Sequence, residues 1–315
     1  MVNGTPTTLR SVGAHYHWRY IYLSRSVQLA DVKVGSSVNT DIPLWRYMSL
    51  DKLVNLLESD SLFFTALETY QHTDPFEGYM PRVAFEAYAK AFEPEIKDLH
   101  AAYEEFKNRP DQNPEQLALL SKMKDGIDGL GEKTKKTFKT ICKGITVNCW
   151  HANECESEAM WKLYSDNGKG IAVKTSVSSI VKSIQHFQQD VLVQIGAVKY
   201  LDFHDINLDP KDCVTDGHLS PLLKRSSFSH ENEVRLFTVP KINSDNVDSF
   251  KSKPEFVKAM ALELIEEVYI SPFAGEPFIS SVKAICNKYL IPHETVKESD
   301  LLEGHEELLD IVSKW

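Results

Sequence analysis

Apolar residues follow two different spacings along the chain. In residues 43–80 and beyond residue 143 they form short runs bounded by glycine, proline or polar residues, a pattern typical of β-strands. Between residues 82 and 143 they recur at every third or fourth position with charged residues between them, which is typical of amphipathic helices. The predicted strands are 43–49, 61–67, 145–150, 170–174, 191–200, 233–239 and 267–271.

Helical patterns lie between these strands without a regular order. The predicted helices are 50–58, 156–165, 177–188, 255–263 and 277–289, and residues 82–143 are a helical insertion interrupted at 108–114. No glycine-rich phosphate loop follows a strand, so the sequence predicts an α+β fold with a mixed, mainly antiparallel sheet rather than a doubly wound fold. We expect an N-terminal extension in residues 1–40, with an aromatic, strand-like segment at 15–23, and a single α+β domain in residues 41–315.

Composition narrows the class of protein. The chain has 315 residues and a formal net charge of −10, which argues against a protein that mainly coats DNA or RNA. Five cysteines, an odd number, without a secretory apolar segment indicate reduced thiols in a cytoplasmic protein. No apolar stretch reaches the length of a membrane span. Residues 294–310 carry seven acids against one lysine, a solvated acidic face, so the rest of the chain has room for a locally positive cleft around Arg46 and Arg235.

The opening strand carries the first candidate for ligand binding. Arg46 stands between Trp45 and Tyr47, and an arginine held on a strand can present its fork to a phosphate or carboxylate. The alternative is an edge-strand arginine between two core aromatics.

The loop after the second predicted strand carries two acids. Asp74 and Glu77 flank Pro75, and two carboxylates at this spacing can bind a cation or act as acid and base. We favour the simpler interpretation, in which they form a turn that caps the helical insertion.

The strand that follows the insertion contains Cys149, Trp150 and His151. A zinc site would need Cys142, Cys149, His151 and Cys155, but these gaps lack the paired ligand spacing of a tetrahedral site. A thiol nucleophile at Cys149 would lack an orienting third group beside His151. In the next helix, Trp161 and Tyr164 share one face and are core aromatics by default.

The fourth candidate is the pair Glu231 and Glu233, two residues apart where a predicted strand begins. Their side chains should point to the same side of the strand. A carboxylate held there can stabilise a developing positive charge, as happens when a glycosidic bond breaks. The alternative is a solvated strand end in which Arg235 pairs with a neighbouring acid.

Four segments, in this order, resemble a widespread bacterial family of uncharacterised proteins: LWRYMS, TDPFE, VNCWH followed by MWKLYSDNGKGIAV, and ENEVRLF. Members of that family carry an aromatic-basic-aromatic strand, an Asp-Pro-Phe-Glu loop, a Cys-Phe-Ser strand before a Met-Trp-x-x-Tyr helix, and a Glu-x-Glu-Trp-Arg strand. The resemblance runs from about Leu44 to Ile291, and the family looks related to abortive-infection proteins of phage defence.

The chain is also similar, more distantly, to ADP-ribosyltransferases with an Arg, Ser, Glu triad. This resemblance implies that Arg46 binds the phosphates of NAD, that residues 149–151 replace a Ser-Thr-Ser strand, and that Glu233 is the catalytic acid beside Glu231. His151 stands where that family has serine. Val234 stands where the bacterial family has tryptophan.

The leading hypothesis is an NAD-using protein that transfers ADP-ribose to a protein or nucleic acid, or hydrolyses NAD, as a toxin or phage-defence effector. Its candidate catalytic residues are Glu233, Glu231 and Tyr164, and its candidate cofactor-binding residues are Arg46, Tyr47, His151, Trp161 and Arg235. One alternative is a non-catalytic binding module whose partner surface is the insertion at 82–143. Another is a metal-dependent nuclease that uses Asp74, Glu77 and Glu233. The oligomeric state is not specified by the sequence.

Overall fold

The computed structural model describes residues 30–240, 250, 254–302, 304 and 311–312. Within these residues, a mixed ten-stranded sheet has the main order β1-β6-β9-β4-β2-β5-β11-β12, and β10 and β3 form a branch that joins at β4. Most pairs are antiparallel, so the predicted α+β class with a mixed sheet is confirmed. The outer strands are β1 (Asp31–Val34), β5 (Ile171–Thr175), β6 (Leu192–Ala197), β10 (Glu255–Lys258), β11 (Glu267–Ile270) and β12 (Val296–Glu298).

The centre of the sheet is formed by three neighbouring strands that lie far apart in the sequence: β9, β4 and β2. β9 (Glu233–Thr238) pairs with β4 (Thr146–Ala152) along its length. The other edge of β4 is shared, because β2 (Leu44–Met48) pairs with its last residues and β3 (Ser61–Ala66) pairs with its first residues. The sheet therefore forks beside the middle of β4.

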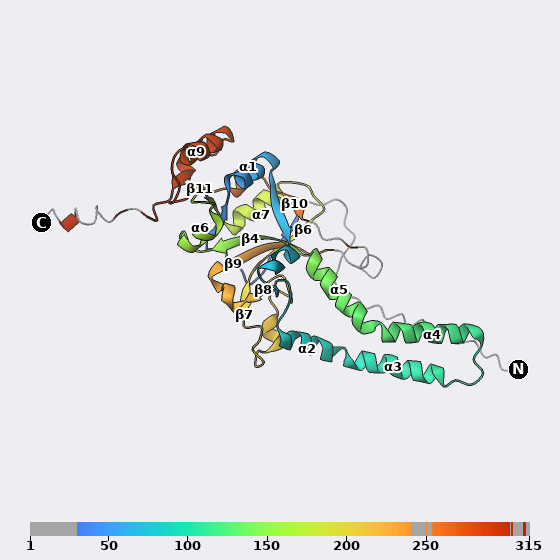
Figure 1. The fold of residues 1–315 in the computed structure, drawn as a ribbon. Coiled ribbons are helices and arrows are strands. Elements are labelled where there is room, and N and C mark those ends of the chain that lie inside the picture. Colours follow the sequence, from blue (N-terminus) through green and yellow to red (C-terminus); the bar gives the residue numbers. More distant parts are fainter. Residues whose placement is uncertain (1–29, 241–249, 251–253, 303, 305–310, 313–315) are drawn as a thin grey trace.

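The two faces of these central strands are different. Side chains alternate along a strand, so Trp150 and Leu236 enter the main apolar core, which is packed by α1 (Leu50–Ser59) and α7 (Val177–Gln185) (Figure 1). Cys149 and Arg235 are opposite one another in the register and face the other way. That second face is covered by the small parallel sheet of β7 (Lys199–Leu201) and β8 (Leu223–Arg225) and by the 3-10 helix η3 (Ser226–Glu231).

Four helices extend away from the sheet: the first two run outward, and the last two return antiparallel to them (Figure 1). They occupy the segment predicted as a helical insertion, and we call them the helical arm: α2 (Arg82–Ala91), α3 (Glu93–Lys107), α4 (Pro114–Asp128) and α5 (Leu130–Gly144). Asn113 begins α4 with a capping box to Gln116, which agrees with the break expected at 108–114. Neither α3 nor α4 buries any residue, and among the described residues these two helices pack mainly against each other.

The remaining helices are α6 (Glu158–Tyr164), α8 (Ala261–Leu264) and α9 (Phe278–Lys288). The helix predicted at 255–263 is wrong. Residues 255–258 are β10, which pairs with β3 so that Val257 is buried opposite Leu62, and only the short α8 follows. Pairing with a distant strand here outweighs the local helical spacing.

The strand predicted at 191–200 is divided into β6 and β7, which belong to different sheets. β1 lies in the segment predicted as an extension, and it pairs in parallel with β6. The predicted strand at 15–23 lies outside the described residues, as do 303 and 305–310 of the acidic tail. In the described part of the chain, no helix is long and apolar enough to cross a membrane.

Candidate functional site

Five charged side chains meet on the second face of the sheet, and we call them the carboxylate network: Glu77, Lys224, Glu231, Glu233 and Arg235. The Nζ atom of Lys224 lies 2.7 Å from Oε1 of Glu233 and 3.7 Å from Oε2 of Glu77, and it also donates to Oε2 of Glu231. Arg235 donates from Nε to Oε2 of Glu233 at 2.5 Å and from Nη1 to Oε1 of Glu77 at 2.8 Å. Both oxygens of Glu233 are therefore held by cations.

The two adjacent glutamates of the carboxylate network have opposite pKa shifts. Three glutamates and two cations leave one negative charge in excess, and desolvation together with the neighbouring Glu233 raises the pKa of Glu231 to about 8. Glu233 has the opposite shift, because Arg235 and Lys224 hold its pKa well below the usual value despite its burial. Two adjacent carboxyl groups with separated pKa values are a common arrangement for acid and base catalysis.

Arg46 lies on β2 beside the fork in the sheet. Its Nη1 is 3.4 Å from the carbonyl oxygen of Cys149, and its guanidinium carbon is 5.7 Å from the centroid of the Trp150 ring. Within the described residues, no carboxylate forms an ion pair with Arg46. Burial lowers the pKa of this guanidinium, so the site holds a cation that lacks a described counter-ion.

Tyr164 lies between Arg46 and the carboxylate network. The hydroxyl group is close enough to Arg46, Glu231 and Glu233 for electrostatic interaction with each. Desolvation raises the pKa of this hydroxyl, so it is protonated at neutral pH. The side chain ends α6 and is 48% exposed, which makes it the accessible rim of the site.

His151 contacts the same site through a hydrogen bond to the backbone of Glu231. Nδ1 lies 2.6 Å from the carbonyl oxygen of Glu231, so Nδ1 carries the hydrogen and Nε2 carries a lone pair. Burial lowers the pKa of the ring and keeps it neutral. Among the described residues, Nε2 is buried without a hydrogen-bond partner.

No family model, curated protein or solved structure matches this chain. The candidate site is therefore argued from its own geometry. Five of the candidate residues come together around the fork: Arg46, His151, Tyr164, Glu231 and Glu233.

The other three candidates have different surroundings. Trp161 is fully buried, donates from Nε1 to Glu156 at 2.8 Å and packs edge-on against Tyr47. The Tyr47 hydroxyl accepts a hydrogen bond from the Ser157 amide at 2.9 Å. Arg235 is 1% exposed and is neutralised by two carboxylates. All three side chains are buried, and their polar atoms are bonded to protein groups.

The capping interpretation of Asp74 and Glu77 is wrong. Asp74 does form a turn, accepting from the Phe76 amide at 3.0 Å, but α2 follows Pro81 and has no side-chain cap. Both acids are buried and serve as ion-pair partners: Asp74 lies 2.7 Å from Nη2 of Arg225, and Glu77 belongs to the carboxylate network. Their partners follow about 150 residues later, so no local pattern indicates them.

The described residues contain no group of three or more His, Cys, Asp and Glu side chains that is arranged to hold a metal ion. Asp74, Glu77 and Glu233 point at cations instead of converging on an open centre. All five cysteines are unpaired, and burial raises the pKa of Cys149 far above neutrality, so this thiol is not a ready nucleophile. These arrangements give no support to the nuclease and thiol alternatives.

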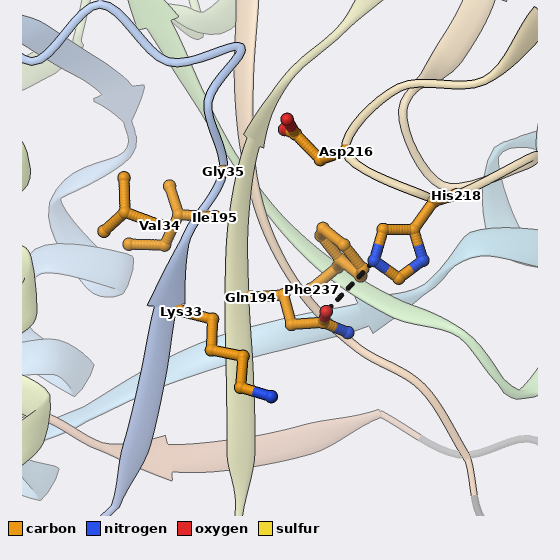
Figure 2. Close-up of a pocket in the computed structure, with 8 residues that line it drawn as sticks. All are labelled: Lys33, Val34, Gly35, Gln194, Ile195, Asp216, His218 and Phe237. Carbon is orange, nitrogen blue, oxygen red and sulfur yellow. Dashed lines mark hydrogen bonds between the residues drawn. The ribbon is translucent and has the colours of Figure 1, made fainter. Parts of the chain in front are cut away.

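A separate cavity of about 200 Å³ opens where β1 and β6 meet the loop that carries Asp216 and His218. Figure 2 shows His218 bound to Gln194, with Nε2 and Oε1 3.0 Å apart, and Lys33 nearby. None of the candidate site residues lines this cavity. Its volume is below the ~300–1,000 Å³ of usual small-molecule sites, and we assign it no part in the candidate site.

Lys224 is the central site residue that sequence analysis missed. It lies in the three-residue strand β8, in a segment without a motif or a regular apolar spacing. A lysine directly after the apolar residues 221–223 was the available signal, since buried lysines are rare unless they are paired.

Proposed function

We propose that the region beside Arg46 binds NAD and that Glu231 and Glu233 assist cleavage of the bond between nicotinamide and ribose. The observation that carries this proposal is the adjacency of β2, β4 and β9 in the sheet. Sequence resemblance to ADP-ribosyltransferases associates these three strands with an arginine, a second motif and a Glu-x-Glu pair. Their adjacency gathers Arg46, His151 and Glu233 into one region.

Arg46 suits the role of the phosphate-binding residue. A guanidinium that is partly desolvated and lacks a described carboxylate partner gains most from an arriving anion. A free carboxylate would compete with a pyrophosphate for this position, whereas the nearest ionisable groups, Cys149, Tyr70 and Tyr164, are neutral at pH 7.

Cleavage breaks the bond between C1′ of the ribose and the nicotinamide nitrogen. The electron pair stays on the nicotinamide nitrogen, so the leaving group departs neutral and needs no proton. Positive charge develops on the ribose, and ionised Glu233 stabilises this charge. The oxygens of Glu233 have lone pairs that Lys224 and Arg235 do not use, and one of them accepts a hydrogen bond from the 2′-hydroxyl. As the bond to nicotinamide breaks, the acceptor oxygen bonds to C1′ and gives its proton to ionised Glu231.

The test is incubation of the purified protein with NAD labelled in the nicotinamide ring, with and without a cell lysate as a source of acceptors. The wild type should release nicotinamide, and Glu233→Gln should slow release on the order of 10²–10³-fold. The matched control is Glu267→Gln, which removes a carboxylate that is paired to Lys174 outside the site. Equal rates in Glu233→Gln and the wild type would contradict the assigned role of Glu233.

A second candidate, the non-catalytic binding module, is favoured by the helical arm. Its outer helices bury no residue, and Leu117 and Leu119 of α4 are 52% and 51% exposed. If partner binding is the function, Leu117→Glu with Leu119→Glu should abolish complex formation without lowering stability, because neither side chain packs into a core. Retention of a complex in that double variant would contradict this candidate.

A further inference from the structure

Lys224 is the one side chain of the carboxylate network that contacts all three glutamates. It comes from β8, outside the main sheet, and is 8% exposed. Tyr200, its neighbour on β7, accepts a hydrogen bond from the Glu233 amide at 2.9 Å. The small sheet therefore holds both the backbone and the carboxyl group of Glu233.

Glu231 and Glu233 differ in the number of cations that contact them. Glu233 is held at one oxygen by Lys224 and at the other by Arg235. For Glu231, Lys224 is the only cation in contact among the described residues, and the side chain remains 14% exposed. Glu233 is held by a cation at both oxygens, whereas Glu231 contacts a single cation and is the more exposed of the two.

We propose that Lys224 is a positioning residue that bridges Glu231 and Glu233, so that Glu231 can give up its proton and act as the base near neutral pH. This inference rests on the proposed function for its catalytic meaning, although the ionisation of Glu231 is a property of the free protein. Without Lys224, Glu77 and Glu233 would share Arg235, Glu231 would contact no cation among the described residues, and the cluster would need a second proton to be neutral.

Loss of the lysine has a defined consequence for titration. Lys224 opposes the upward shift of Glu231 both through its charge and through its hydrogen bond, so its removal should raise the pKa of Glu231 above the present value of about 8. We expect a rise of at least one pH unit in Lys224→Met. Below the pKa, such a rise would lower nicotinamide release at pH 7 about tenfold.

The experiment is a pH titration of the full chain labelled with ¹³C at the glutamate carboxyl carbons, followed by NMR without any ligand. Glu231→Gln assigns the signal that moves near pH 8. Lys224→Arg keeps the charge and should hold the midpoint within about half a unit. Lys174→Met is the matched control, because Lys174 is also a strand lysine, although less buried than Lys224, and is paired with a glutamate, Glu267, 3.0 Å away.

Variants that lose a buried partner risk unfolding, so Lys224→Met is also prepared together with Glu77→Gln, which removes one excess carboxylate. A midpoint that rises by a unit or more in either folded variant supports the proposal. An unchanged midpoint in the folded double variant, or a wild type without a glutamate titrating near pH 8, overturns it. Absence of NAD turnover with a shifted midpoint contradicts the proposed function and leaves the positioning role supported.

Discussion

Two arginines on the central strands should affect the stability of the fold in opposite directions when each is replaced by methionine. Arg235 joins Glu77 and Glu233 at 2.8 and 2.5 Å, and all three side chains are buried. Removing one partner of a buried ion pair leaves an uncompensated charge and costs about 3–5 kcal/mol. We therefore expect Arg235→Met to lower the free energy of unfolding by about that amount.

Among the described residues, Arg46 has no carboxylate partner that the substitution would leave unpaired. Arg46→Met removes one long hydrogen bond, worth about 0.5–1 kcal/mol, and a contact with the Trp150 ring worth about 0.5–2 kcal/mol. It also removes the desolvation cost of a partly buried guanidinium. The expected result is an unchanged free energy of unfolding or a gain of up to about 2 kcal/mol.

The assay is urea unfolding followed by tryptophan fluorescence, with the free energy taken by linear extrapolation. The control is Arg82→Met, because Arg82 is an exposed arginine paired with Glu86 on α2 and should change stability by less than about 0.5 kcal/mol. The reasoning is refuted if Arg46→Met loses more than about 1 kcal/mol, or if Arg235→Met is as mild as Arg82→Met.

Three further predictions concern titration and backbone conformation. Nicotinamide release should rise about tenfold per pH unit and level off near pH 8, since the ionised form of Glu231 is the base; a flat profile between pH 6 and 8 would contradict this role. The stability that Glu231 contributes is fully present below its unfolded pKa of about 4.5 and is lost as pH rises through about 8, because folding raises its pKa, so wild-type stability relative to Glu231→Gln should decrease over this range. Glu267, whose pKa Lys297 and Lys174 lower, should make no such contribution there, and its stabilisation relative to Glu267→Gln should be lost only as pH falls below about 4.5. Gly168→Ala should lower the melting temperature more than Gly217→Ala, because both residues have positive φ but only at Gly168 would the new Cβ lie 2.7 Å from a backbone oxygen, that of Phe273; equal shifts would show that close approach is unimportant there.

The parts of the fold that sequence patterns predicted are those whose local spacing agrees with their final neighbours. β2, β4 and β9 are short apolar runs, and all three lie in the centre of the sheet. The helical arm has the spacing of amphipathic helices. Residues 255–258 were misassigned, because Phe256 and Val257 fit either a helix face or a strand, and pairing with β3 decides between them. A single sequence does not contain that distant partner.

The candidate site shows the same limit. The pair Glu231 and Glu233 could be predicted to share one side of a strand, since alternate residues do so in any strand. That Arg235 neutralises Glu233, and that Lys224 and Glu77 complete the network, depends on β8 and on the loop before α2 folding over β9. Arg46 and Arg235 look alike in sequence, and only their three-dimensional neighbours distinguish a cation without a carboxylate partner from one held by two.

The central claim, that the region beside Arg46 is a site for NAD, is tested most directly by calorimetric titration of NAD into the wild type and into Arg46→Met. The account predicts saturable one-site binding to the wild type. In Arg46→Met the affinity should be about 10–100-fold weaker, as expected for loss of charge-assisted hydrogen bonds worth about 1.5–3 kcal/mol. Absence of NAD binding by the wild type, or equal affinity in the two proteins, would contradict it.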